Sequence, residues 1–244
     1  MLISYLNKLI SKWKGSDYKI DESVPPSYLL RLILVRLWML VKGFFSGIKN
    51  DGLFFVSGSA VIRQRSKLAV GRAVTINSGC YIDALSKNGI VLGNNVSVGR
   101  NTKIEGTGNL QHLGKGMIAG NNVGLGNDCF YGCAGGIEIG DDTIVGNYVS
   151  FHSENHAFSD PQNLIRLQGV THKGIKVGKN CWIGAKVILL DGVVIGDGCI
   201  ISAGAVMTTG FYPGNSVYGG IPARLIKKRE TEIVNKANME NVNA

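Results

Sequence analysis

The chain has 244 residues, among them 34 glycines and only 5 prolines, and a formal net charge of +9. This length can bury one substantial core, and the composition excludes collagen-like and proline-rich disordered chains. Basic residues gather in the first fifty positions and after Ala223. Because no nucleic-acid recognition motif accompanies them, we expect no nucleic-acid partner and favour a membrane surface or a phosphate-bearing ligand.

The amino-terminal segment, residues 1–50, is predicted to be helical. Residues 3–13 indicate a short amphipathic helix, 17–26 a turn-rich linker and 28–48 a longer apolar helix. In that helix Arg31 and Arg36 oppose membrane insertion by roughly 5–7 kcal/mol, which offsets what its apolar residues contribute. We therefore expect no spanning helix. Residues 28–48 either lie on a membrane surface as a peripheral contact or pack on the open end of the following domain or on a partner subunit.

A six-residue period dominates the rest of the chain. Aliphatic residues recur at 177, 183, 189, 195 and 201, Met207 closes the run, and shifted blocks begin at Val70, Leu92, Leu113 and Ile139. A period of six fits neither a helix nor a free strand, but it fits a short strand followed by a Gly-Asp or Gly-Asn turn. Such units stack into one continuous core. We predict a solenoid over residues 51–212 and a carboxy-terminal extension over 213–244 that includes a short helix.

Two stretches carry a family resemblance that covers roughly residues 56–228. "CWIGAKVILLDGVVIGDG" and "IGDGCIISAGAVMTTGFYPGNSVYGGIPARLIKKR" resemble the last coils of hexapeptide-repeat acyltransferases, in their sugar O-acetyltransferase branch. The resemblance implies an all-β fold, a left-handed parallel β-helix of triangular section, which the helices read from residues 1–50 would precede. It also implies a homotrimer and acetyl-coenzyme A as the acyl donor.

The five cysteines are interpreted as buried apolar residues. Cys129 and Cys133 have the spacing of half a zinc site, but no second pair follows them. No signal peptide is recognisable, so we expect reduced thiols and a cytoplasmic protein, with peripheral contact to the inner face of the membrane as an option. We expect no metal.

The period breaks over residues 152–174, and interruptions of a regular solenoid tend to carry function. Asn155-His156 and Asp160-Pro161 resemble the family's catalytic loop, which lies beside a neighbouring subunit. The resemblance implies that His156 is the general base that removes the proton of a sugar hydroxyl, a role that suits the pKa of imidazole. In an extended segment Glu154 lies on the same side as His156 and could orient it. We interpret His152 as a surface or interface residue, and His112 and His172 as surface residues.

The rest of the predicted site follows from the resemblance. The amide of Ala185, just after Trp-Ile-Gly, would stabilise the oxyanion, and Trp182, Asn155 and Asp160 would contact the acceptor. Backbone groups of the last coils and basic residues near the end would bind acetyl-coenzyme A, through Gly184, Ala203, Gly204, Thr208, Thr209, Ile221, Pro222, Arg224 and Lys227.

The leading interpretation is an acetyl-coenzyme A-dependent O-acetyltransferase acting on a sugar of a cell-surface polysaccharide or its lipid-linked precursor. Three alternatives stay open. One is a γ-type carbonic anhydrase-like metalloenzyme that uses His152, His156 and His112. The others are an N-acetyltransferase of an amino sugar, which would need the same base, and a non-catalytic trimeric scaffold.

Overall fold

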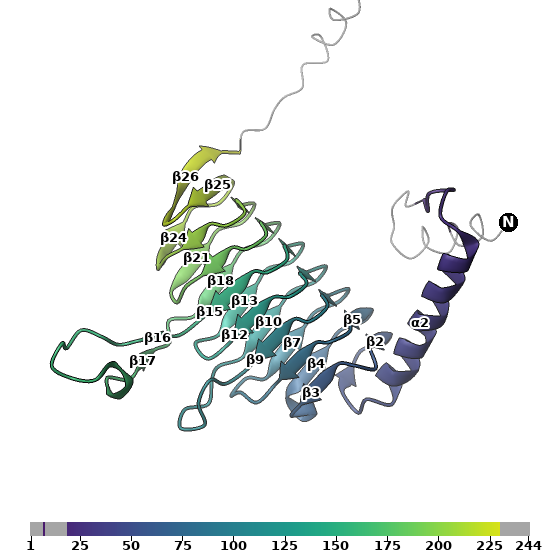
Figure 1. The fold of residues 1–244 in the computed structure, drawn as a ribbon, viewed down its shortest axis with the longest axis horizontal. Helices are drawn as coiled ribbons and strands as arrows, with labels where there is room; N and C mark the ends of the chain where they lie inside the picture. Colours follow the sequence, from purple (N-terminus) through teal and green to yellow (C-terminus); the bar gives the residue numbers. More distant parts are fainter. Residues whose placement is uncertain (1–6, 8–18, 230–244) are drawn as a thin grey trace, which may run out of the picture.

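The structure is a computed structural model that describes Asn7 and residues 19–229. The helix expected at 3–13 and the end of the carboxy-terminal extension lie outside the described residues. Helix α2 (Pro26–Phe44) stands at one end of a long stack of short strands, and β25 and β26 close the other end (Figure 1). The strands form three long sheets, one on each side of a prism.

Each turn of the chain, called a coil below, contributes one strand to each sheet in succession. Sheet A contains β1 (Lys49–Asn50), β4 (Leu68–Val70), β7 (Ile90–Leu92), β10 (Met117–Ala119), β13 (Ile137–Ile139), β18 (Ile175–Val177), β21 (Val193–Ile195) and β24 (Gly210–Tyr212). Sheet B contains β2 (Phe54–Val56), β5 (Val74–Ile76), β8 (Ser97–Val98), β11 (Gly124–Leu125), β14 (Ile144–Val145), β19 (Trp182–Ile183), β22 (Ile200–Ile201), β25 (Ser216–Gly220) and β26 (Ala223–Lys228). Sheet C contains β3 (Val61–Arg63), β6 (Tyr81–Asp83), β9 (Lys103–Glu105), β12 (Phe130–Gly132), β15 (Ser150–His152), β20 (Ile188–Leu189) and β23 (Val206–Met207). These strands pair in parallel except at β25 and β26.

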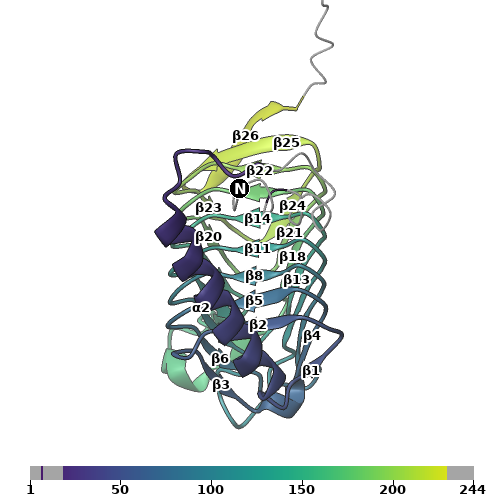
Figure 2. The ribbon, with the colours of Figure 1, turned by 90° about the vertical axis from the view of Figure 1, so that its right-hand side faces the viewer.

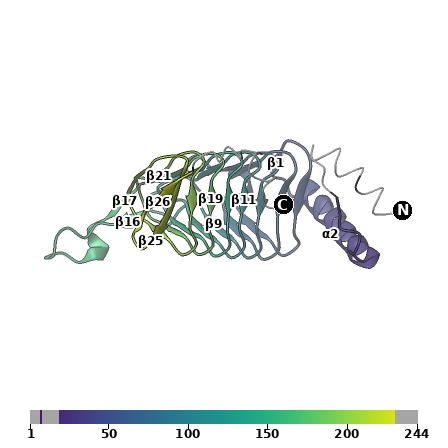
Figure 3. The same ribbon diagram turned by 90° about the horizontal axis from the view of Figure 1, so that it is seen from above.

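The predicted left-handed parallel β-helix is confirmed, and so is the reason for its six-residue period. The repeated aliphatic side chains point inward and stack on their counterparts in the next coil, as Val145, Ile183 and Ile201 do in sheet B. In sheet C the rings of Tyr131 and Phe151 stack with centroids 4.8 Å apart. The interior is one apolar column, since no coil can bury its inner face alone. Figure 3, which looks from above, shows the successive coils side by side.

The corners of the prism explain the Asn, Asp and Gly residues of the repeat. Asn95, Asn122 and Asp142 occupy equivalent corner positions with φ of 57–59°, where most other side chains would be strained. Their side chains also bond along the prism, from Asn95 Nδ2 to Asn122 Oδ1 (3.1 Å) and from Asn122 Nδ2 to Asp142 Oδ1 (2.8 Å). Asn and Asp are therefore favoured at these corners for two reasons: they tolerate positive φ, and their side chains hydrogen-bond to the next coil.

Helix α2 lies against the first strands of sheet B, as Figure 2 shows. Leu29, Met39 and Gly43 are buried, and Arg36 donates to Thr75 Oγ1 at 2.9 Å while its guanidinium lies 5.1 Å from the Phe55 ring centroid. Burial lowers the pKa of Arg36. Among the described helices, none has the length and apolarity needed to cross a membrane.

Two parts of the chain differ from the sequence-based expectation. Residues 223–228 form strand β26, antiparallel to β25, where we expected a short helix to begin; pairing with the last parallel strand satisfies its open edge. Leu113, assigned to a repeat, is half-exposed in an excursion over residues 106–116 between β9 and β10. Leu113 was assigned to the repeat because it lies six residues before the buried Ala119, which matches the period by chance.

Candidate functional site

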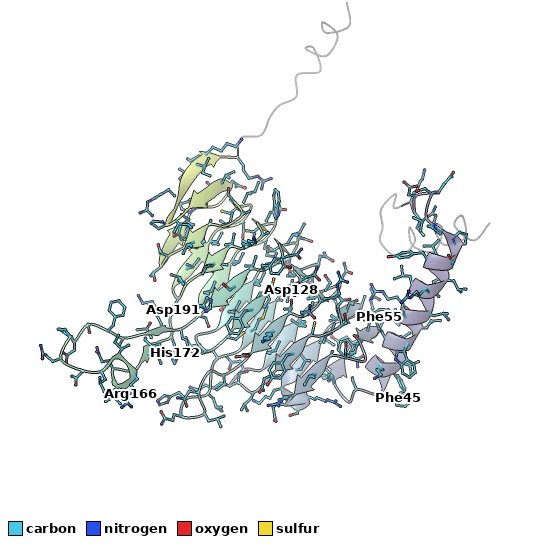
Figure 4. All side chains as sticks on the ribbon, viewed as in Figure 1. Phe45, Phe55, Asp128, Arg166, His172 and Asp191 are labelled. Atoms are coloured by element: carbon cyan, nitrogen blue, oxygen red, sulfur yellow. The ribbon has the colours of Figure 1, made fainter. Side chains whose placement is uncertain are left out.

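The segment between β15 and β18, residues 153–174, leaves the prism as predicted and is called the excursion loop below. Its two arms pair as a short antiparallel ladder, β16 (Asn155–His156) with β17 (Val170–Thr171), and the 3-10 helix η2 (Ile165–Leu167) lies beyond them. Figures 1 and 4 show it projecting far from the sheets, with Arg166 in the outer part and His172 and Asp191 near its base.

Asp191 fastens the base of the excursion loop to the prism. Its side chain is 4% exposed. Oδ2 accepts hydrogen bonds from Thr171 Oγ1 (3.0 Å) and the Lys173 amide (3.1 Å), and Oδ1 accepts one from the Gly174 amide (2.7 Å). The Asp191 carbonyl accepts a bond from Thr209 Oγ1 at 2.5 Å. The sequence analysis missed this residue, since its Leu-Asp-Gly context looks like any other turn.

A groove of about 290 Å³ opens where the excursion loop meets the corner between sheets C and A. The predicted base His156 and its neighbour Asn155 line one side. Thr209, predicted as a cofactor residue, lines it together with Thr171, Lys173 and Asp191. The groove is thus a place where a hydroxyl-bearing ligand can reach the exposed His156 imidazole.

Glu154 has a different partner from the one predicted. Its Oε2 lies 3.2 Å from Nε2 of His172, and the structure gives no contact between Glu154 and His156. A Cβ added to Gly108 would lie 2.7 Å from Glu154 Oε1, so the 106–116 excursion touches this pair. Lys115 Nζ in turn donates to the His172 carbonyl at 3.0 Å. His172, expected to be a plain surface residue, therefore joins the two excursions at the base of the site.

A second cluster lies at the corner between sheets B and C. On the earlier coils the amide after each corner glycine donates to an asparagine of the next coil: Arg100 N to Asn127 Oδ1 (2.7 Å), then Asn127 N to Asn147 Oδ1 (2.9 Å). The equivalent residues of the next two coils are Ala185 and Ala203, which offer no acceptor. Within residues 19–229, the amides of Asn147 and Ala185 have no hydrogen-bond partner, and both residues are exposed. This series of bonds, called the corner ladder below, thus ends in free donors beside the predicted oxyanion residue.

Trp182 lies on the outer face of sheet B, 56% exposed, in register with Ile144 and Ile200 of the adjoining strands. It therefore belongs to the face next to Ala185, on a different side of the prism from the His156 groove. Within one chain the predicted residues form two groups. His156, Asn155 and Thr209 share one corner, and Trp182, Ala185, Ala203 and Gly204 lie on or beside another.

Several predicted residues have structural roles in the chain. Asp160 holds the excursion loop together, since Oδ1 accepts from the Gln162 amide (2.9 Å) and Oδ2 from Asn163 Nδ2 (2.5 Å). Gly184 is buried and donates to the Ile201 carbonyl at 2.8 Å. Thr208 exchanges hydrogen bonds with the Tyr212 hydroxyl.

The predicted residues near the chain end remain open to solvent. Gly204 has a φ of 73° and nothing within 4 Å of an added Cβ, so its own backbone conformation accounts for the glycine. Ile221 and Pro222, joined by a cis peptide bond, and Arg224 and Lys227 on β26 are all exposed.

Burial shifts the pKa of His152 and of the five cysteines. His152 packs near the Phe130 ring (5.6 Å between centroids), and partial burial lowers its pKa. The five cysteines are all buried, as expected, and burial raises the pKa of Cys80 and Cys181 to about 11. In the part of the chain that the structure describes, no three His, Cys, Asp or Glu side chains gather as a metal-binding set.

Comparisons with known proteins agree with this architecture. Residues 174–209 match the family described as "Bacterial transferase hexapeptide (six repeats)". A Mycobacterium tuberculosis protein named "Probable acetyltransferase Rv3034c" is 28% identical over 81% of this chain, which spans 58% of that protein's length. An Escherichia coli protein named "Putative lipopolysaccharide biosynthesis O-acetyl transferase WbbJ" is 28% identical over 52% of this chain and 70% of its own.

Among solved structures, the crystal structure of the S84A mutant of AntD, an N-acyltransferase from Bacillus cereus in complex with dTDP-4-amino-4,6-dideoxyglucose and coenzyme A, has the same fold. Its TM-score is 0.53 at 21% identity, covering 81% of this chain and 92% of that one. The predicted resemblance to hexapeptide-repeat acyltransferases is confirmed by the matched repeat and by the two acetyltransferase relatives.

Proposed function

We propose that this protein transfers an acetyl group from acetyl-coenzyme A to a hydroxyl of a sugar, in a cell-surface polysaccharide or its lipid-linked precursor. The observation that carries the proposal is His156, exposed in the groove at the base of the loop that interrupts the hexapeptide repeat. The names of the mycobacterial and Escherichia coli relatives support acetyl transfer, and the second name supports an O-linked acceptor.

In the proposed reaction the imidazole of His156 takes the proton of the acceptor hydroxyl while its oxygen attacks the thioester carbonyl. The new C–O bond and the negative charge on the carbonyl oxygen form together. Collapse then breaks the C–S bond, and the imidazolium returns its proton to the departing thiolate. The imidazole of His156 must be neutral at the start, because only the neutral ring has a nitrogen lone pair that can accept the proton.

The free amide of Ala185 suits the developing oxyanion. A backbone N–H with no partner within the described residues is already oriented by the corner and loses no intraprotein hydrogen bond when it binds charge. The open corner around Ala203 and Gly204 leaves room for an extended pantetheine chain, and Arg224 and Lys227 supply cations for the phosphates of the donor.

This chemistry requires His156 and Ala185 to meet, although they lie on different corners of one chain. We therefore infer a homotrimer, in which the excursion loop of one copy lies beside sheet B of the next. Exposed Phe158, Leu164, Ile165 and Leu167 on the loop and Trp182 on the sheet fit such a contact. Light scattering coupled to size exclusion should give three times the chain mass, and a monomer at assay concentration would contradict this arrangement.

The outer face of α2 suits a membrane surface. Leu30, Leu34, Leu37, Trp38, Val41 and Phe44 are 46–80% exposed, residues 26–50 contain no acidic residue, and Arg31 and Lys42 add positive charge to the helix. An interfacial helix has this composition. The proposed setting is the cytoplasmic face of a membrane, where a lipid-linked acceptor is presented. Sedimentation with anionic vesicles should fall sharply in a Leu34→Glu, Trp38→Glu variant that keeps its activity on soluble acceptors.

The test of the activity follows release of coenzyme A thiol from acetyl-coenzyme A in the presence of candidate sugars, with mass spectrometry of the product. His156→Ala should lower kcat by roughly 10²–10⁴-fold, the usual contribution of a general base. His112→Ala, which removes an imidazole from the other excursion, is the matched control and should keep its rate. Equal rates for the His156 variant and the wild type, on any acceptor that is acetylated, would refute the proposed base.

A further inference from the structure

The groove beside His156 has a basic neighbour that the proposed reaction does not use. A second pocket of about 210 Å³ lies on the same edge of the prism, over β10, β13 and β18. Lys115, Lys173 and Lys176 line it, against a single carboxylate, Glu138. Lys173 lines both pockets, so the two spaces adjoin through its side chain.

The ammonium groups of this pocket are available to a ligand. Lys115 uses one of its three donors on the His172 carbonyl (3.0 Å). Within residues 19–229, the Lys173 ammonium has neither a hydrogen bond nor an ion pair. Glu138 pairs with Lys176 at 3.2 Å, but both side chains are more than half exposed, and such a pair contributes little and exchanges readily.

The protein holds two of these lysines in place. The Lys173 amide bonds to the buried Asp191, and its side-chain stem passes Gly192, where an added Cβ would lie 3.0 Å from Lys173 Cδ. The stem of Lys115 passes Gly136 in the same way, with Cβ to Cβ at 3.3 Å. Gly136 and Gly192 have positive φ (95° and 79°) and present no side chain, so the first part of each lysine stem lies close along the backbone beside the pocket.

We infer that the acceptor is a sugar bearing a phosphate or pyrophosphate group, which Lys115 and Lys173 bind while the sugar ring occupies the groove beside His156. The inference rests on the proposed function for the location of the sugar. The donor's phosphates have separate cations, because Arg224 and Lys227 belong to β26 at the far end of the prism. Phosphate linked to a sugar has two sources, a water-soluble nucleotide sugar and a sugar on a lipid pyrophosphate, and the chemistry that binds them here is the same.

Binding measured without acetyl-coenzyme A separates this inference from the acyl transfer. The two probes are UDP-N-acetylglucosamine by titration calorimetry and phosphatidylcholine vesicles carrying undecaprenyl-pyrophosphoryl-N-acetylglucosamine by sedimentation. At least one should bind, and the neutral sugar N-acetylglucosamine should bind far more weakly. Whichever probe binds more tightly identifies the source of the phosphate.

The variants Lys115→Gln and Lys173→Gln should each weaken binding of that probe by about 10- to 100-fold, the loss expected for one charge-assisted hydrogen bond. Lys103→Gln removes the same charge from β9, outside both pockets, and should have no such effect. Unchanged binding in the Lys115→Gln, Lys173→Gln double variant overturns the inference, as does equal binding of the neutral sugar or binding of neither phosphorylated probe. Lysine-dependent binding without acetyl transfer would instead refute the proposed function and leave the phosphate site standing.

Discussion

Replacing Asp191 by Asn should release the excursion loop without unfolding the prism. The buried carboxylate accepts bonds from the amides of Lys173 and Gly174 and from the Thr171 hydroxyl, at 2.7–3.1 Å. An asparagine of the same shape has one acceptor oxygen, so its NH₂ group must face at least one backbone donor. The variant loses one charge-assisted bond to a backbone N–H, about 1.5–3 kcal/mol.

That free energy belongs to the loop rather than to the stacked coils, whose own backbone bonds are untouched. Local opening of residues 153–174 should become roughly 10- to 100-fold more frequent, at 1.4 kcal/mol per tenfold. Hydrogen exchange followed by mass spectrometry measures this directly, because peptides from the loop and from residues 117–151 are read in the same sample. Loop peptides should exchange faster, and peptides of the coils should keep their rates.

Asp128→Asn is the matched control. Its carboxylate is exposed at a corner and accepts from Asn101 Nδ2 (3.0 Å), a bond that an asparagine oxygen can replace. Figure 4 shows Asp128 on the prism, away from the loop that Asp191 anchors. Unchanged loop exchange in the Asp191 variant, or equal acceleration throughout the chain, would refute the assignment of Asp191 as a local anchor.

Two further predictions test the prism itself. In Gly184→Ala the new Cβ would lie 2.6 Å from the Ala203 amide nitrogen, so the free energy of unfolding in denaturant should fall by about 3 kcal/mol. Gly204→Ala has open space around the new Cβ but a φ of 73°, and its free energy of unfolding should fall by about 1 kcal/mol. The opposite order would contradict the packing described. At pH 8 a thiol reagent should find no reactive cysteine in the native protein and five in guanidinium chloride, because burial raises the pKa of thiols such as Cys80 and Cys181 to about 11. A thiol that reacts within minutes in native buffer would show that the core opens readily.

The fold was predictable because each coil repeats the same physical solution. The inward aliphatic residues at 177, 183, 189, 195 and 201 are all buried, and the turns use Asn, Asp and Gly where φ is positive. The excursion over 152–174 was visible as a break in this pattern. The 106–116 excursion was not, because Leu113 happens to keep the spacing to Ala119.

The predicted site was harder to place from sequence, and its roles remain proposals. Periodicity indicates that His156 leaves the prism. The partner of Glu154 is His172 on the other arm of the same loop, and no local pattern encodes how the two arms meet. Asp191 was missed because its carboxylate binds residues 17–20 positions earlier, on the returning arm of the loop, where the repeat has not yet resumed. Contacts between excursions are set by three-dimensional packing, whereas contacts between coils follow the repeat.

The corner ladder has a consequence for how such a molecule can change size. From β2, where α2 is fastened, to β14, beside which the ladder ends, sheet B advances by four strands, roughly 19 Å at about 4.8 Å per step. Adding or deleting one whole coil between them would shift the histidine by one such increment relative to the helix and leave its immediate neighbours intact. The distance between His156 and any surface that binds α2 can therefore change only in whole-coil steps.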